Sequence, residues 1–315
     1  MTTPVFFVAG LALLYLGGEG LVRSAAAIGV RLGMSPLIAG LTIVAFATSA
    51  PELTISLDAA LTGVPGLAVG NVVGSNICNI ALILGITALV RPASLRGQLI
   101  RRDVLVMVLS TLLVPGFLLD GELSRIEGAL LVVSIAIYIF LTVWTARKTP
   151  SHVAAANSKV PVLSRSIWIN FLLAAGALTM LILGSDLLVT ASVAIAVAIG
   201  VPSAVIGLSA AAFGTSLPEL TASIVAARHG HPEMAAGNLI GSNIFNLLMI
   251  LGVTSVITPL GRGGVTLLDL TVMVVVSLFA LTLMVTKNRI ERVEGLALIT
   301  IYALYMMWLF VKGAF

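Results

Sequence analysis

A stretch of just over fifty residues occurs twice in this chain, and the two copies align without a gap. The first covers residues 40–92 and the second covers residues 207–259. Glu52 corresponds to Glu219 at an offset of 167 positions (219 minus 52), and about half of the paired residues are identical. A repeat at one fixed offset indicates a structural unit that is used twice. Because packing alone would not keep a glutamate at the same place in two apolar segments, the duplication predicts one site built from two halves.

The composition indicates where this site lies. Hydrophobic residues make up 59% of the chain and charged residues 10%, with a mean hydropathy of +1.16, whereas about a quarter of a soluble domain is charged. Crossing a bilayer takes about 20 apolar residues in a helix, and strand-like alternation is absent, so helices are expected. The sequence predicts an all-α integral membrane protein with ten transmembrane helices, at 4–24, 34–62, 66–90, 103–119, 126–146, 167–199, 202–227, 233–258, 266–286 and 293–312.

The distribution of Lys and Arg predicts the orientation of these helices. With ten spans, 14 of the 17 basic residues fall in the connections on one side of the membrane. The positive-inside rule makes that side cytoplasmic and places both termini outside the cytoplasm. Each half of the chain contains five of these spans. Because five is an odd number, the second half enters the membrane in the opposite orientation to the first. We therefore expect two inverted five-helix repeats, as in many secondary transporters. The expected divisions are a first repeat at 1–147, a cytoplasmic linker at 148–166 and a second repeat at 167–315.

Glu52 and Glu219 lie well inside their predicted spans. An unpaired carboxylate there costs about 2.5–3.5 kcal/mol even on a lenient insertion scale. The sequence has no Lys, Arg or His between Arg31 and Arg91, and again none between Arg165 and Arg228. A salt bridge to a neighbouring residue is thereby excluded, and Arg23 on the first span is left as a basic partner from another helix. The simplest partner for the two carboxylates is therefore a bound cation or a proton.

The residues around the two glutamates offer oxygen atoms as ligands. Pro51 and Pro218 cannot donate a backbone hydrogen bond and should each free a carbonyl about four residues upstream, and the glycines of the motifs let backbones approach closely. Such oxygens suit Na⁺ or Ca²⁺ and offer nothing soft for zinc or copper. The candidate ligands are the hydroxyls of Thr48, Ser49, Ser75, Thr215, Ser216 and Ser242, the amides of Asn76, Asn79, Asn243 and Asn246, and the carbonyls near Ala47 and Gly214.

Simpler interpretations apply to several polar residues. Ser and Asn inside spans often serve helix packing, although four Asn repeated beside two Glu favour a site. Glu19 and Asp186 correspond at the same offset, and we expect both to be structural anchors, with Arg23 one turn after Glu19. The three histidines, His152, His229 and His231, are expected to lie in loops and to be solvated. Cys78 is expected to be a packing residue, and because it is the single cysteine it forms no internal disulfide.

The paired motifs AFATSAPEL with GNVVGSNICN, and AFGTSLPEL with GNLIGSNIFN, resemble the alpha repeats of the cation/calcium exchanger superfamily, and above all its prokaryotic sodium/calcium antiporters. The resemblance implies a core of spans 2, 3, 7 and 8 around the ions, with the first and sixth spans sliding across it. It implies that Glu52 and Glu219 bind calcium, together with the carbonyls of Thr48 and Thr215. It further implies sodium ligands at Ser49, Ser75, Ser216 and Ser242, with Asn79 and Asn246 in the middle of the site.

The expected function is antiport of Na⁺ against Ca²⁺ across the cell inner membrane by alternating access. Relatives that depend on potassium carry Asp where this chain has Asn246, which speaks against potassium coupling here. Exchange of calcium for protons stays open, because the same glutamates could titrate. A cation channel is an alternative of another class, and an enzyme is not expected, because no His accompanies the intramembrane serines. We expect no cofactor besides the transported ions, and no partner besides the lipid bilayer: no nucleic acid and no obligate protein.

Overall fold

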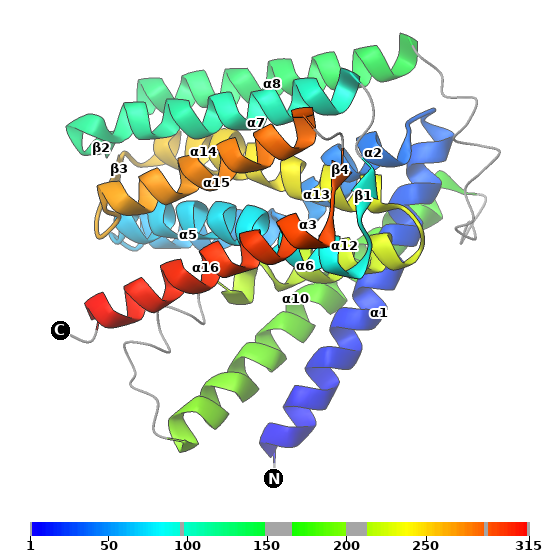
Figure 1. The fold of residues 1–315 in the computed structure, drawn as a ribbon, viewed down its shortest axis with the longest axis horizontal. Helices are drawn as coiled ribbons and strands as arrows, with labels where there is room; N and C mark the ends of the chain where they lie inside the picture. Colours follow the sequence, from blue (N-terminus) through cyan, green and yellow to red (C-terminus); the bar gives the residue numbers. More distant parts are fainter. Residues whose placement is uncertain (1, 95–97, 149–165, 200–212, 287–288, 314–315) are drawn as a thin grey trace.

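The computed structural model describes residues 2–94, 98–148, 166–199, 213–286 and 289–313. These residues form an α-helical bundle (Figure 1), as the sequence predicts for a chain that must satisfy its backbone hydrogen bonds inside lipid. Nine helical segments in the described ranges are long and apolar enough to cross a membrane. The predicted seventh span, 202–227, lies partly outside the described residues, and its second half forms α12 (Leu217–Arg228).

Corresponding helices follow the sequence in the same order in both repeats. Those of the first repeat are α1 (Thr2–Arg31), α2 (Pro36–Ala39), η1 (Gly40–Val44), α3 (Ala45–Thr48), α4 (Ala50–Leu61), α5 (Pro65–Ile77), η2 (Cys78–Ile83), α6 (Leu84–Val90), α7 (Gln98–Phe117), η3 (Leu118–Asp120) and α8 (Arg125–Lys148). Those of the second are α10 (Ile167–Ala198), α12, α13 (Pro232–Ile244), η4 (Phe245–Ile250), α14 (Leu251–Ile257), α15 (Leu267–Thr286) and α16 (Arg292–Gly313).

Two short strand pairs join the repeats and show their two-fold relation. The strands are β1 (Ala93–Ser94), β2 (Glu122–Leu123), β3 (Leu260–Gly261) and β4 (Arg289–Ile290). β1 pairs with β4 through Ala93 and Ile290, and β2 pairs with β3 through Leu123 and Leu260. Ala93 corresponds to Leu260 at the offset of 167, and Leu123 corresponds to Ile290, so the two residue pairs are equivalent. Such an exchange of partners is what a two-fold axis between repeats produces, and it agrees with the inverted arrangement.

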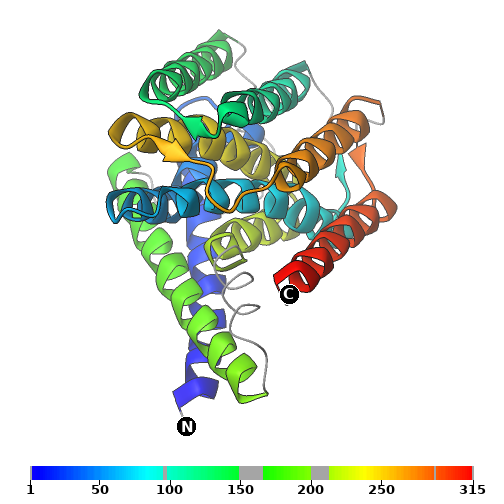
Figure 2. The same cartoon turned by 90° about the vertical axis from the view of Figure 1, so that its left-hand side faces the viewer.

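The long helices α1 and α10 pack against each other antiparallel and extend from one side of the bundle (Figures 1 and 2). A Cβ atom on Gly10 would lie 2.9 Å from the carbonyl oxygen of Gly184, and one on Gly17 would lie 2.8 Å from that of Ala177. The two contacts are equivalent, because Gly10 corresponds to Ala177 and Gly17 corresponds to Gly184 at the offset of 167. Glycine is therefore required where these backbones cross.

Helix α1 continues to Arg31, seven residues beyond the predicted end of the span. Within the helix, Arg23 forms an ion pair with Glu19 one turn earlier, at 3.1 Å. The following turns bury Ala25 and Ile28 against the bundle. A paired charge is compatible with a continuous helix, so this boundary was predicted wrongly.

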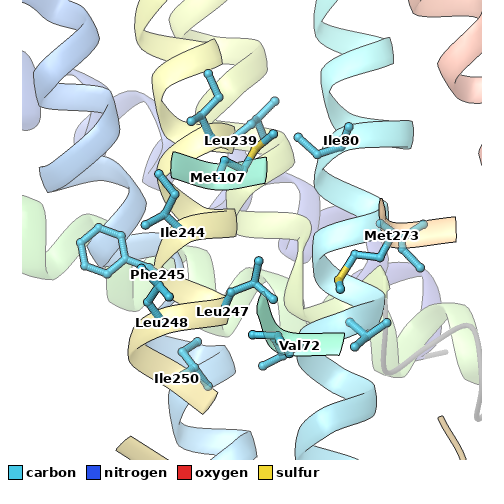
Figure 3. Packing of buried hydrophobic residues seen from close by; sticks show 14 of the residues in the cluster. Val72, Ile80, Met107, Leu239, Ile244, Phe245, Leu247, Leu248, Ile250 and Met273 are labelled. Carbon is cyan, nitrogen blue, oxygen red and sulfur yellow. The ribbon is translucent and has the colours of Figure 1, made fainter. Parts of the chain in front are cut away.

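The apolar core lies around α5 with η2 and α13 with η4 (Figure 3). Val72 and Ile80 from the first of these segments and Phe245 and Leu247 from the second belong to one cluster of buried side chains. Met107 of α7 and Met273 of α15 close the cluster. These two segments are therefore the most buried spans of the protein, with 78% of each apolar window inside the bundle, and whatever polar groups they carry face protein and not lipid.

Helical geometry is interrupted at equivalent places in the two repeats. Ser49 ends α3 with ψ near 1°, and Ser216 precedes α12 with ψ near 2°. In both cases a proline follows within the first turn of the next helix, where its missing N–H costs least. The π-helical segments η2 and η4 occupy corresponding residues, and such segments recur at functional sites. The chain is thus irregular where the duplicated motif lies.

Candidate functional site

Glu52 and Glu219 occupy the first turns of α4 and α12, directly after the two helix breaks. Both residues are fully buried, and their carboxylates are close enough to repel each other. None of the four carboxylate oxygens has a hydrogen-bond partner among the described residues. Arg23, the basic residue that the sequence left as a partner, bonds to Glu19 instead. Neutral hydroxyls nearby cannot balance the charge of two buried carboxylates that repel each other, so the pair requires a positive partner from elsewhere.

Hydroxyl groups from both repeats surround the carboxylates. The Thr48 hydroxyl lies 3.4 Å from that of Ser242, and the Ser75 hydroxyl lies 3.3 Å from that of Thr215. These two contacts are images of each other at the offset of 167, and each joins one repeat to the other. The side chains of Thr48, Ser49 and Ser242 lie around the Glu219 carboxylate. Ser216, in the break before α12, is buried as Ser49 is.

Amide groups from η2 and η4 and the ends of α5 and α13 form a second layer. Asn79 donates from Nδ2 to Oδ1 of Asn243 at 3.1 Å, and Asn243 donates to the carbonyl oxygen of Asn76 at 3.3 Å. The Oδ1 atoms of Asn76 and Asn79 and both polar atoms of Asn246 have no hydrogen-bond partner among the described residues. Amide oxygens thus lie buried and unengaged in the same two core segments.

The predicted carbonyl ligands differ between the repeats. Pro51 has no N–H to donate to the carbonyl of Ala47, and that residue is half-buried. The Gly214 carbonyl accepts a hydrogen bond of 2.5 Å from the Ser185 hydroxyl of α10. The residue that corresponds to Ser185 is Gly18, which has no hydroxyl. The prediction that both carbonyls are free was therefore wrong for Gly214.

A cavity of about 250 Å³ reaches the site from one side. It lies between α10 and the helix breaks, and its lining includes Ser185, Asp186, Thr215 and Pro218. Asp186 is exposed there and has no hydrogen bond or ion pair with another described residue, so the described residues give no support to the prediction that it is a structural anchor.

The corresponding region beside α1 is closed. A Cβ atom on Gly18 would lie 2.7 Å from a methyl carbon of Thr221 in α12, and Val22 is fully buried. Glu19, the counterpart of Asp186, bonds to Arg23 at 3.1 Å and to Nε2 of His229 at 2.6 Å. Glu19 therefore anchors α1 to the end of α12, as expected for a structural residue. His229 was wrongly expected to be solvated, and so was His231, which is 8% exposed; His152 lies outside the described residues.

The sequence interpretation missed two buried asparagines, Asn71 on α5 and Asn238 on α13. Each donates to a serine on the neighbouring glutamate helix, Ser56 at 3.1 Å and Ser223 at 3.0 Å. A signal was present, because all four residues repeat at the offset of 167. The asparagines are also the second letters of the two GN motifs. The sequence interpretation gave them no role, although they lie in the same motifs as the four asparagines taken as candidate ligands.

The chemistry of the site is that of hard oxygen donors. Among the residues that the structure describes, no group of three His, Cys, Asp or Glu side chains comes together. The site instead combines two carboxylates with neutral hydroxyl and amide oxygens. Such a set suits alkali and alkaline-earth cations, which prefer oxygen, and gives no thiolate or imidazole for transition metals.

Comparisons with known proteins agree with this chemistry. Residues 2–144 and 169–311 match the family described as sodium/calcium exchanger protein. The chain is 33% identical to the sodium/calcium exchanger MaX1 of Methanosarcina acetivorans over 96% of both chains. It is 35% identical to the inner membrane protein YrbG of Escherichia coli over 82% of this chain and 81% of that protein.

The structure is similar to that of the sodium-calcium exchanger NCX_Mj, with a TM-score of 0.83 and 30% identity over 97% of this chain and 98% of the other. The same two-repeat membrane architecture therefore underlies both proteins. With the family match across both halves, the chain belongs to the sodium/calcium exchanger family, whose members are cation transporters and not enzymes.

Proposed function

We propose that the protein exchanges Na⁺ for Ca²⁺ across the cytoplasmic membrane by alternating access. The observation that carries this proposal is the pair of buried carboxylates, Glu52 and Glu219, whose four oxygens have no partner among the described residues. A charge of −2 is balanced by one Ca²⁺ or by two Na⁺. The two ions can therefore replace each other in one site without leaving a buried net charge, and this is the basis of exchange.

The ligand set that we propose for these ions keeps the residues that the family resemblance implies, leaves out Asn76 and Asn243, and changes one of the two predicted carbonyls. Glu52, Glu219 and the backbone of Thr48 and Thr215 bind calcium. The hydroxyls of Ser49, Ser75, Ser216 and Ser242 bind sodium, and Asn79 and Asn246 contribute amide oxygens. The carbonyl of Ala47 stays in the set, whereas that of Gly214 joins it only when the Ser185 hydroxyl moves away.

Alternating access is supported by the difference between the two related mouths. One has a cavity that reaches Thr215, and its counterpart is closed by Gly18 against Thr221 and by the bonds of Glu19. A channel needs a continuous path, whereas an exchanger needs one mouth closed at a time. We place the repeats at 1–147 and 167–315 with a cytoplasmic linker at 148–166, and both termini outside the cytoplasm.

Exchange of Ca²⁺ for protons is the second candidate, because two carboxylates that repel each other can also be neutralised by protonation. The deciding experiment is uptake of radioactive calcium into proteoliposomes loaded with Na⁺. The proposal is supported if uptake follows the sodium gradient and is absent without it. Uptake should then also be unaffected by an imposed proton gradient and by potassium. Uptake driven by the proton gradient alone would replace it with the second candidate. Calcium flux without any counter-ion would indicate a channel.

A further inference from the structure

Asn71 and Asn238 lie outside the proposed ligand set, yet each contacts the helix that carries a glutamate. They are 8% and 1% exposed, and they correspond at the offset of 167. Asn71 donates to the Ser56 hydroxyl on α4, and Asn238 donates to the Ser223 hydroxyl on α12. Each serine follows the glutamate of its helix by four residues, so it lies one turn further along the same face.

The same amide nitrogens also reach the glutamates themselves. Nδ2 of Asn71 lies 3.4 Å from the backbone oxygen of Glu52, and Nδ2 of Asn238 lies 3.5 Å from that of Glu219. One amide thus fixes two successive turns of the glutamate helix to the neighbouring core helix. The glutamates need such support because their helices begin immediately after a break, where no preceding helical turn holds the first turn in place.

Asn238 makes an additional contact with the other repeat. Its Oδ1 atom accepts a hydrogen bond from the Thr48 hydroxyl at 3.3 Å. A single buried amide therefore joins the Glu219 helix, through Nδ2, to the residue just before the helix break of the first repeat, through Oδ1. The positions of Glu219 and Thr48 relative to each other depend on this side chain.

We propose that Asn71 and Asn238 are positioning residues that hold the two carboxylates at the spacing required by a divalent cation; this inference rests on the proposed function. A dication interacts with each carboxylate twice as strongly as a monocation does. Loosening a carboxylate should therefore weaken calcium binding more than sodium binding. An asparagine that served only to pack two helices together would affect both ions alike, or neither.

The test substitutes Asn71→Ala and Asn238→Ala and measures both ions in the same preparation. The matched control is Asn170→Ala, which removes a buried asparagine on α10 that bonds to the carbonyl of Ser166 in its own helix at 3.0 Å. In proteoliposomes we expect the KM for calcium to rise about tenfold, which corresponds to about 1.4 kcal/mol. The KM for sodium should rise much less, and the control should leave the ratio of the two constants unchanged.

Equal changes in both constants, or no change in either, would overturn the inference. If an alanine variant does not fold, Ser56→Ala and Ser223→Ala remove the side-chain acceptor on each glutamate helix while keeping the asparagines, and should shift the same ratio in the same direction. Equilibrium dialysis of the detergent-solubilised protein with radioactive calcium and sodium separates the two proposals. A wild type that binds both ions but does not exchange them would refute the proposed function, and the binding ratio of the variants would still decide the inference. A wild type that binds neither ion overturns both.

Discussion

Glu52 and Glu219 are the residues on which exchange depends most directly. Glutamine has nearly the same shape, so Glu52→Gln and Glu219→Gln should fold while each removes one charge from the site. Because breaking a buried charge pair costs about 3–5 kcal/mol, we expect calcium exchange to fall at least about 100-fold in either variant. Calcium uptake into proteoliposomes measures the loss, and a thermal unfolding curve checks the fold. Glu122→Gln, at an exposed carboxylate in β2, is the control; rates like the wild type's in both site variants would contradict the proposed site.

Asn246 is buried, with neither polar atom bonded to a described residue. Asn246→Asp adds a third carboxylate beside two that already repel. We expect transport to persist but to depend on pH or on potassium, because a proton or an added monovalent cation would relieve the repulsion. Calcium flux measured against pH, with and without potassium, tests this. The wild type should need no potassium, and an absolute requirement would show that the charge at this position does not control coupling.

At the level of elements, the crossing of α1 and α10 depends on glycine. A Cβ atom on Gly184 would lie 2.8 Å from the backbone nitrogen of Leu14 and 2.9 Å from the Gly10 oxygen, whereas one on Gly176 in the same helix would meet nothing within 4 Å. Gly184→Ala should therefore destabilise the protein by about 1–3 kcal/mol, as overpacking does. Gly176→Ala should be neutral or slightly stabilising. Thermal unfolding in detergent compares them, and equal melting temperatures would show that the helix pair adjusts without cost.

The same elements show how far the sequence alone can lead. Apolar length predicted the spans and their order, and the duplication pointed to the buried glutamates Glu52 and Glu219, because both signals can be read directly along the sequence. The end of α1 was predicted too early because the turns after Arg23 are held by the packing of Ala25 and Ile28 against the bundle, which the sequence alone does not show. The bond from Ser185 to Gly214 and the contact of His229 with Glu19 depend on how distant helices pack. Tertiary contacts of this kind leave no periodic signal.

For the whole molecule, the 14 to 3 division of basic residues makes an orientation prediction. In a Cys78→Ala background, a cysteine substituted at Arg31, exposed at the end of α1, should react with a membrane-impermeant maleimide only from the cytoplasmic side. One substituted at Asp120, exposed beside β2, should react only from outside. Intact cells and inverted vesicles supply the two sides. Reaction of both positions from the same face would refute the inverted arrangement.

The two strand pairs have a consequence for the origin of the molecule. β1 and β2 of the first repeat pair with β4 and β3 of the second, and one residue pair is the image of the other. A chain of half the length, inserted into the bilayer in both orientations, would form both pairs between two separate copies. The present protein is in this sense a fused antiparallel dimer. In a fused chain the paired positions can differ, as Ser185 differs from Gly18 and Asp186 from Glu19, so the two openings to the site have different chemistry.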